Sequence, residues 1–196
     1  LVGVIPNGER TILDLHRAGG VPAVMKALSG HINPRPMTVT GEPIRSYYES
    51  AKVRDPEVIH SVEAPWKEAS GIAILKGNIA EQAVVRVSGV KEKMLKYTGV
   101  AKVFTSIEEA RRFLRASPPR DHTVLVVPYQ GLKGAPGLNS LLPLSSEIIG
   151  MGLEETVAIV TDGRFSGGAR GLCVGLATPE GAEGGNIALI EDGDII

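Results

Sequence analysis

The sequence predicts a fold of mixed helices and strands, either an α/β sheet or a mixed β-barrel module, preceded by a helical connector. Two observations predict it. Apolar residues recur with helical spacing over residues 11–28, whereas from Gly71 onward they fall in short runs of strand length. These runs alternate unevenly with helical patterns, which argues against a helical bundle.

The first segment, residues 1–70, is predicted to be a connector that packs on another domain. Residues 11–18 have helical spacing, Gly19 and Gly20 interrupt it, and residues 21–28 resume it. Three prolines then favour an extended stretch, and the polar remainder is typical of an irregular linker with helical turns.

The second segment, residues 71–196, is predicted to hold a series of short strands. Ser106 has the character of a helix N-cap, because Glu108 and Glu109 follow in the first turn and apolar residues then share one face. A second helix is expected around residues 138–149. The predicted strands share apolar, β-prone runs bounded by turn residues, and they are residues 72–75, 83–87, 100–104, 123–127, 157–161 and 187–190.

Composition excludes several classes of protein. The chain has 196 residues, 43% of them hydrophobic, and a formal net charge of -1, which argues against disorder. The charge forms no basic stripe for nucleic acid, and no apolar run is long enough to span a bilayer. A single cysteine, Cys173, excludes a disulfide framework and a self-sufficient Fe–S or zinc-thiolate site. A soluble, reducing, cytoplasmic setting is therefore expected.

Chemistry is expected in two glycine-rich loops, each of which follows a predicted strand. Of the 24 glycines, 14 lie between Gly131 and Gly193. The first loop covers residues 129–137 and the second covers residues 161–171. Loops that follow strand C-termini commonly carry sites in open α/β sheets, because the strand ends place them at one rim.

The second loop has two readings. Its glycines, Gly167 and Gly168 among them, allow the backbone to approach a ligand closely and turn amide groups toward an anion. Ser166 would then expose its hydroxyl between Arg164 and Arg170, which suit a carboxylate. The alternative is a tight structural turn with solvated arginines, and spacing alone does not decide between them.

Other kinds of site find less support in the residues. The loops lack the ending of a P-loop and the full dinucleotide fingerprint, and Arg164 breaks the Gly-x-Ser-x-Gly elbow of a hydrolase. The four histidines are scattered without ligand spacing. Cys173 lies in an apolar run, which favours a buried, inert thiol over a nucleophile.

Several segments of the sequence resemble a known family. Residues 159–175 read IVTDGRFSGGARGLCVG and are followed by TPE at 178–180, which resembles the C-terminal signature of the dihydroxy-acid dehydratase and phosphogluconate dehydratase family. Three further segments agree in order along the chain, namely DLHRAGGVPAVM at 14–25, GIAILKGNIA at 71–80 and GLKGAPG at 131–137. The serine loop looks most like the dihydroxy-acid branch.

The resemblance implies a two-domain subunit. Residues 1–70 would be the tail of the family's N-terminal domain, and residues 71–196 would be most of a swivelling β/β/α C-terminal domain, a barrel-like mixed sheet with flanking helices. That domain is expected to be incomplete at its C-terminal end. The resemblance places the cysteines of an Fe–S cluster and the main Mg²⁺ ligands on the N-terminal domain, so that no metal is expected on this chain alone. It also implies a homo-oligomer.

The implied reaction is that of a hydro-lyase, which removes water from a 2,3-dihydroxy acid to give a 2-oxo acid in branched-chain amino-acid biosynthesis. Ser166 matches the family's proposed base, and Arg164, Gly167 and Gly168 would bind the substrate. An isolated serine hydroxyl is too weak a base, so it would need the metal and the amide dipoles of its loop. The chain alone is therefore expected to be inactive.

Three positions depart from the family pattern. Gln130 stands where the family has glutamate, Ser140 stands where a further glutamate is expected to reach Mg²⁺, and Leu176 stands where histidine is common. A neutral hydroxyl at position 140 adds no negative charge to a hard-cation site. These departures leave an alternative open: a non-catalytic paralogue or ligand-binding domain that keeps the fold but has lost metal ligands.

Overall fold

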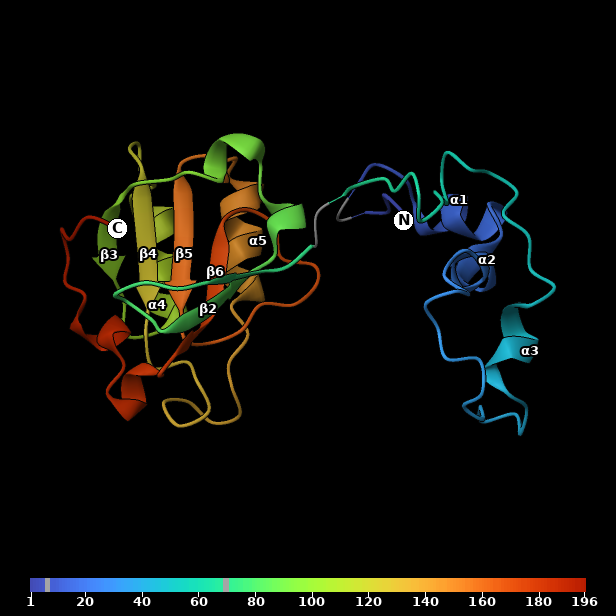
Figure 1. Cartoon of the computed structure of the whole chain (residues 1–196). Coiled ribbons are helices and arrows are strands. Elements are labelled where there is room, and N and C mark those ends of the chain that lie inside the picture. Colours follow the sequence, from blue (N-terminus) through green and yellow to red (C-terminus); the bar gives the residue numbers. More distant parts are fainter. Residues whose placement is uncertain (6–7, 69–70) are drawn as a thin grey trace. The chain divides into compact units, whose positions relative to one another are not determined.

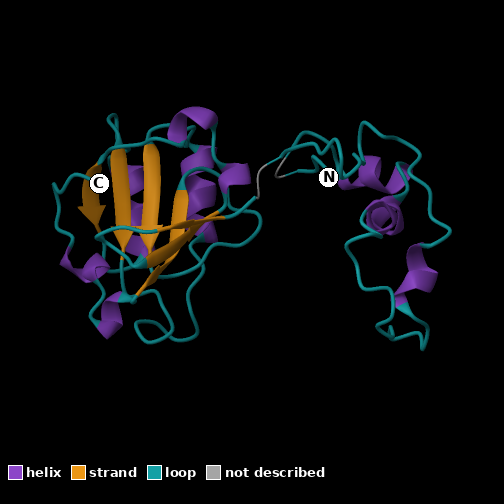
Figure 2. Cartoon of the chain, in the orientation of Figure 1, coloured by secondary structure: helices purple, strands orange, loops and turns teal. Residues whose placement is uncertain are grey.

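The computed structural model describes residues 1–5, 8–68 and 71–196. Its contacts divide the chain into two units, residues 1–69 and residues 70–196 (Figure 1). The described part of the first unit holds short helices, turns and isolated β-bridges, whereas the second unit holds all the strands of the described sheet (Figure 2). Each unit is described by itself below.

Two helices in the first unit are separated by a glycine, as the sequence predicts. Helix α1 (Ile12–Arg17) begins with a capping box, in which the Thr11 hydroxyl accepts from the amide of Asp14 at 3.2 Å and the Asp14 carboxylate accepts from the amide of Thr11 at 2.7 Å. Gly19 has a φ of 124° and ends this helical path before α2 (Gly20–Ala27) starts.

A short third helix and a small core complete the first unit. Helix α3 (Ile44–Tyr48) lies at the start of the stretch for which the sequence predicts an irregular linker with helical turns. The core is formed by buried side chains from α1, α2 and the segment that follows α3, namely Leu15, Ala18, Ala23, Val58 and Ile59.

The second unit is built on a six-stranded mixed sheet with the order β1-β2-β6-β5-β4-β3. The four strands from β3 to β6 are parallel, whereas β2 pairs antiparallel with β6 and β1 antiparallel with β2. Because β1 and β3 lie at opposite ends of this order, the open α/β sheet is favoured over the barrel alternative. The strands are β1 (Ala73–Leu75), β2 (Gln82–Val85), β3 (Val100–Val103), β4 (Thr123–Val127), β5 (Val157–Thr161) and β6 (Cys173–Thr178).

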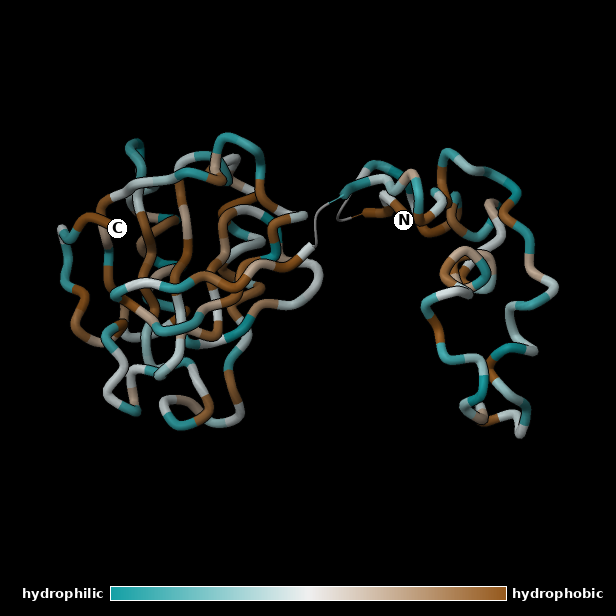
Figure 3. Tube along the Cα trace, in the orientation of Figure 1, coloured by the Kyte–Doolittle hydropathy of each residue, from teal (hydrophilic) through white to brown (hydrophobic). Residues whose placement is uncertain are grey.

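One face of the sheet is covered by the two longer helices of this unit. Helix α4 (Ile107–Ala116) and α5 (Leu142–Gly150) bury a core against β4 and β5, which are buried along their whole length and mostly brown in Figure 3. The core side chains of this face include Leu114, Leu125, Leu144, Ile148 and Ile159. Ser106 caps α4 as predicted, since its hydroxyl accepts from the amide of Glu109 at 3.2 Å.

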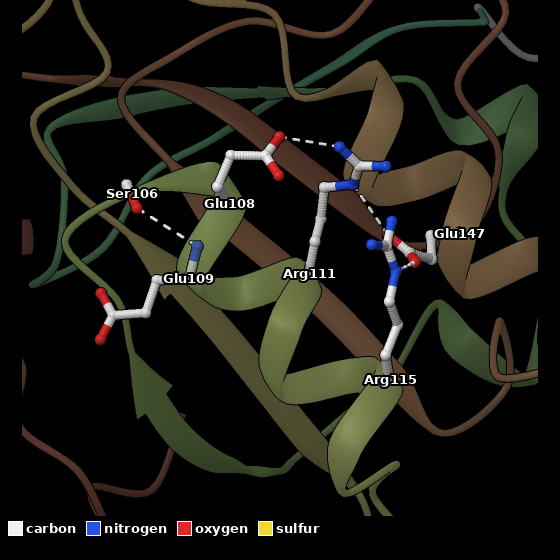
Figure 4. A network of polar contacts seen from close by, with 6 residues as sticks. All are labelled: Ser106, Glu108, Glu109, Arg111, Arg115 and Glu147. Atoms are coloured by element: carbon white, nitrogen blue, oxygen red, sulfur yellow. Dashed lines mark hydrogen bonds and ion pairs between the residues drawn. The ribbon is translucent and has the colours of Figure 1, made fainter.

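A charged network joins the two helices at the edge of this core (Figure 4). Glu147 of α5 accepts a hydrogen bond from the Nε of Arg111 at 2.8 Å and pairs also with Arg115, both from α4. Arg111 in turn donates to Glu108 at 2.7 Å. Only 15% of the Glu147 side chain is exposed, so this network is less screened by solvent than an ordinary surface pair.

The other face of the sheet is covered by irregular chain. Val126, Ala158 and Ala177 lie in its core together with Ile187, which is fully buried. Ile187 belongs to a 3₁₀ helix, Asn186–Leu189. The segment that follows returns to the sheet edge, where Ile195 bridges Val100.

The structure corrects three details of the predicted elements. Residues 187–190 are not a strand. The run begins in a 3₁₀ helix in which the amide of Ala188 donates to the carbonyl of Gly185, and Ile187 is its buried side chain. Strand β6 was not predicted, since Gly175 interrupts its apolar pattern. Helix α5 starts at Leu142 rather than near residue 138.

Within the described residues, every helix falls short of the length and apolar character that a bilayer span requires.

Candidate functional site

The two glycine-rich loops lie at the same rim of the sheet, as predicted. Strands β4 and β5 are parallel neighbours, with Val127 paired to Thr161, so the segments that follow them start side by side. Strand β6 is parallel to β5, and the segment after Thr178 joins the same rim (Figure 1). This rim is the usual position for a site in an open parallel sheet.

Asp162 ties these three segments together. Its carboxylate is buried and accepts hydrogen bonds from the backbone amides of Tyr129 at 3.0 Å, Gln130 at 2.7 Å and Gly181 at 2.8 Å. Three amide donors compensate the desolvation of a buried carboxylate. The rim is therefore held by one side chain that lies four positions before Ser166.

The serine loop leaves the rim and crosses the sheet face toward the start of β6. The aromatic ring of Phe165, in this loop, packs against the backbone of Gly175. A Cβ added at Gly175 would lie 2.9 Å from Phe165 Cδ2. Further along, the Arg86 guanidinium donates to the Ala169 carbonyl, and the amide of Gly171 donates to the Gly89 carbonyl at 3.0 Å. The loop is thus pinned at both ends of the serine.

Ser166 lines a pocket between this loop and strands β2 and β6. The pocket has a volume of about 200 Å³. Ser166 is half-buried, and its Oγ accepts a hydrogen bond from the amide of Gly168 at 3.3 Å. The wall is largely apolar but includes one cation, and its side chains come from Ile72, Val84, Arg86, Phe165, Cys173 and Leu176.

Arg86 is the charged side chain in the wall of this pocket. Burial lowers the pKa of the Arg86 guanidinium, and the charge of Arg170 lowers that pKa further. Cys173, also in the wall, donates its Sγ hydrogen to the Arg170 carbonyl at 3.4 Å. Burial raises the pKa of the Cys173 thiol to about 12, which makes it the inert thiol that the sequence favours.

The predicted substrate-binding residues divide into two groups. Gly167 lines the pocket and Gly168 contacts the Ser166 hydroxyl, so both lie beside the serine. Arg164 is exposed, and its Nε donates to the carbonyl of Leu138 at 3.3 Å, directly after the first glycine-rich loop. In the described residues, neither Arg164 nor Arg170 lines the pocket, and the substrate-binding role expected of Arg164 stays a prediction.

The three departures from the family pattern have different structural settings. Gln130 is buried, donates to the Pro128 carbonyl at 3.2 Å and accepts from Asn139 at 2.9 Å. A glutamate could not donate to that carbonyl, so Gln130 fits this loop as a structural residue. Ser140 accepts from the amide of Leu142 at 3.5 Å, and Leu176 lies in the pocket wall with a φ of 55°.

The described residues do not form a metal site. Across residues 1–5, 8–68 and 71–196, no group of three or more His, Cys, Asp or Glu side chains lies together as a metal-ligand set. The buried thiol of Cys173 stands alone and holds its proton. The Fe–S cluster and Mg²⁺ that the resemblance implies therefore find no ligand set in this part of the chain.

Arg86 is the site residue that sequence reasoning missed. It follows the apolar run of β2 directly and is the one charged residue within residues 82–90. The sequence signal that could have identified Arg86 is a single cation directly after an otherwise apolar strand. A further cavity of about 480 Å³ lies in the first unit beside Thr38 and Tyr47, and none of the predicted site residues lines it.

Comparison with known protein families agrees with this architecture. The family model described as dihydroxy-acid/6-phosphogluconate dehydratase C-terminal matches residues 57–196. A second model, described as dihydroxy-acid/6-phosphogluconate dehydratase N-terminal, matches residues 1–47. The border between the two matches lies within the first unit of the structure, residues 1–69.

Curated relatives are similar along the whole chain. The dihydroxy-acid dehydratase of Thermodesulfovibrio yellowstonii is 45% identical over 197 residues, which cover 100% of this chain and 36% of the relative. That of Methanococcoides burtonii is 45% identical over 201 residues, with the same shares covered. That of Caldanaerobacter subterraneus subsp. tengcongensis is 48% identical over 194 residues, 97% of this chain and 35% of the relative. The chain thus spans about a third of the length of these relatives.

Proposed function

Because the chain belongs to the dihydroxy-acid/6-phosphogluconate dehydratase family, we propose that it contributes the Ser166 pocket to a hydro-lyase. The reaction removes water from a 2,3-dihydroxy acid and yields a 2-oxo acid. The observation that carries the proposal is the position of Ser166, half-buried in a pocket with its Oγ bonded to the amide of Gly168. The second unit acts as the swivelling domain and closes over the family's N-terminal domain.

The proposed chemistry at Ser166 is proton abstraction. The serine oxygen, as an alkoxide, takes the proton from C2, and the electron pair of that C–H bond forms a double bond to C3. The 3-hydroxyl leaves with a proton as water, and this proton is balanced by the one that Ser166 took from C2. The resulting enol takes up a proton at C3 and loses the proton of its C2 hydroxyl, which gives the 2-oxo acid. Each substrate molecule gives one 2-oxo acid and one water.

The loop supports Ser166 in this role by stabilising negative charge on its oxygen. The amide of Gly168 donates to Oγ at 3.3 Å, and a hydrogen bond to the charged form favours that form. The cation of Arg86 in the same wall acts in the same direction. These groups do not expel the 3-hydroxyl, so the departure of water depends on groups outside this chain.

A chimera tests the proposal. The chain replaces the matching third of the Thermodesulfovibrio yellowstonii dihydroxy-acid dehydratase, and formation of 2-oxo acid from 2,3-dihydroxy-3-methylbutanoate is followed. We expect turnover by the chimera, loss of turnover by Ser166→Ala, and unchanged turnover by Ser117→Ala, which changes an exposed serine at the end of α4. Unchanged turnover in Ser166→Ala rejects the assignment of the base. The chain alone is expected to show no dehydratase activity.

A second candidate function is ligand binding without catalysis. It is favoured by Gln130, which the loop uses as a structural amide, and by the neutral Ser140. In that case calorimetry finds binding of a 2-oxo or dihydroxy acid that does not depend on Mg²⁺, and the chimera shows no turnover. Turnover by the chimera excludes this second function.

A further inference from the structure

We propose that Arg86 binds the carboxylate of the acid in the Ser166 pocket, a role that the sequence alone gave to Arg164. The inference rests on the proposed function, because it takes the pocket to be the place where a small hydroxy acid is held. It identifies a substrate-binding residue directly after β2, outside both glycine-rich loops.

The position of Arg86 carries the first step. Arg86 follows β2 directly, and β2 pairs with β6, whose Cys173, Gly175 and Leu176 form the wall opposite the serine loop. The guanidinium donates to the carbonyl of Ala169, three residues after Ser166. The strand pairing and this hydrogen bond fix the cation relative to the serine before any ligand arrives, so little order has to be created on binding.

The charge of the pocket wall is the second observation that supports the proposal. The pocket wall is apolar apart from Ser166 and Arg86, and Arg170 adds a positive charge close enough to act on Arg86. A partly buried guanidinium keeps its proton, and its planar fork matches a carboxylate. An acid that enters with its carboxylate on Arg86 leaves its alkyl part against the apolar wall.

The chemistry of the substrate links Arg86 to Ser166. In a 2,3-dihydroxy acid, C2 is bonded directly to the carboxylate carbon. A carboxylate held by Arg86 therefore places C2 within the same 200 Å³ that Ser166 lines. Neutralising the carboxylate also eases removal of the C2 proton, because charge that develops on the carboxylate oxygens meets a fixed cation.

Arg164 does not meet these conditions. Its Nε donates to the Leu138 carbonyl, and its backbone pairs with Asn139 and Leu141, which follow the first glycine-rich loop. These contacts join Arg164 to the segment between β4 and α5, and Arg164 does not line the pocket.

Calorimetry on the full chain tests the inference. The probes are 2-oxo-3-methylbutanoate and its neutral primary amide, titrated into the unchanged protein, Arg86→Met, Arg86→Lys and the control Arg120→Met. Arg120 is exposed between α4 and β4, so its replacement removes the same charge far from the pocket. We expect Arg86→Met to weaken binding of the acid at least ~10-fold, the effect of a lost charge-assisted hydrogen bond. Arg120→Met should leave it unchanged.

The amide and the lysine variant keep the inference testable. The amide should bind all four proteins alike, because it carries no charge for Arg86 to hold. If Arg86→Met fails to fold, Arg86→Lys decides, since lysine keeps the charge but loses the planar fork. We expect Arg86→Lys to weaken binding of the acid several-fold and to leave binding of the amide unchanged. Equal affinity of the acid for Arg86→Lys and the unchanged protein overturns the inference, as does an unchanged protein that does not bind the acid.

The chimera separates this inference from the proposed function. If Ser166→Ala abolishes turnover while Arg86→Met leaves the KM unchanged, the function stands and the role of Arg86 is wrong. If the acid needs Arg86 for binding but the chimera shows no turnover, the role of Arg86 stands and the proposed reaction is wrong.

Discussion

The carboxylate of Asp162 accepts a hydrogen bond from the backbone amide of Gly181 at 2.8 Å, across 19 positions of the sequence. The same carboxylate holds the amides of Tyr129 and Gln130, so one buried side chain fixes the segments after β4 and β6 to the start of the serine loop. The geometry of the Ser166 loop therefore depends on a residue that does not line its pocket.

Replacement of Asp162 by asparagine tests this dependence. The side-chain amide would turn an N–H group toward one of the three backbone donors, which leaves a buried amide without its acceptor. We expect the free energy of unfolding to fall by about 1–3 kcal/mol. Urea unfolding followed by circular dichroism measures it, with Asp121→Asn, an exposed acid before β4, as the control. Equal unfolding midpoints for the two variants would contradict the structural role of Asp162.

Much of the sheet could be predicted because its strands are apolar runs with clear ends. Strands β4 and β5 have the predicted bounds, and the cap at Ser106 and the break at Gly19 lie where the residues place them. In each case the signal is local: a buried run, a capping side chain or a glycine with positive φ. The run at 187–190 shows the limit, since a short apolar run does not specify whether a partner strand is present.

The site could be predicted only in part, because its contacts join residues far apart in sequence. The glycines and the serine mark the loop, but Arg86 meets that loop only after β2 pairs with β6. The direction of Arg164 was equally hidden, since it depends on the carbonyl of Leu138. Spacing along the chain identifies a loop, whereas the pairing order of the sheet decides which cation the loop faces.

A substitution at Gly175 should disturb both stability and the pocket. An added Cβ would meet Phe165 Cδ2 at 2.9 Å and the Gly163 carbonyl at 3.1 Å, so the ring and the serine loop must shift. We expect Gly175→Ala to lower the free energy of unfolding by about 1–3 kcal/mol, the usual effect of overpacking. Gly77→Ala is the matched control, because an added Cβ there meets nothing within 4 Å. A Gly175→Ala protein as stable as the control would show that the loop yields freely.

The ion pairs of Glu147 with the arginines of α4 should make stability depend on pH more strongly than the exposed pair of Glu108 with Arg111 does. Arg115 and Arg111 hold the pKa of Glu147 below its ordinary value of 4.5. A lowered pKa in the folded state gives stability that is present above the unfolded value and is lost as the pH falls through the folded value. We expect Glu147→Gln to cost ~1 kcal/mol at pH 7, and less as the pH falls below 4.5.

Chemical unfolding of both proteins at several pH values measures this difference. Glu108→Gln serves as the control, since 69% of the Glu108 side chain is exposed. A difference between Glu147→Gln and the unchanged protein that stays constant from pH 7 to acid pH would show that charge at position 147 plays no part.

The buried thiol gives a prediction for alkaline conditions. Burial raises the pKa of Cys173 from 9.0 to about 12, so at pH 8 the folded protein holds far less thiolate than the unfolded chain. Because the thiolate is the reactive form, we expect iodoacetamide to label the folded protein roughly a thousandfold more slowly than the urea-unfolded chain.

The same thiol should make stability depend on pH under alkaline conditions. A raised pKa gives stability that is present below the unfolded value of 9.0 and is lost as the pH rises toward 12. Cys173→Ala should remove the labelling and flatten this alkaline loss. Rapid labelling of a protein with a native circular dichroism spectrum would instead mean that the wall between Arg86 and Cys173 opens readily, and that the Ser166 pocket is not the fixed site described above.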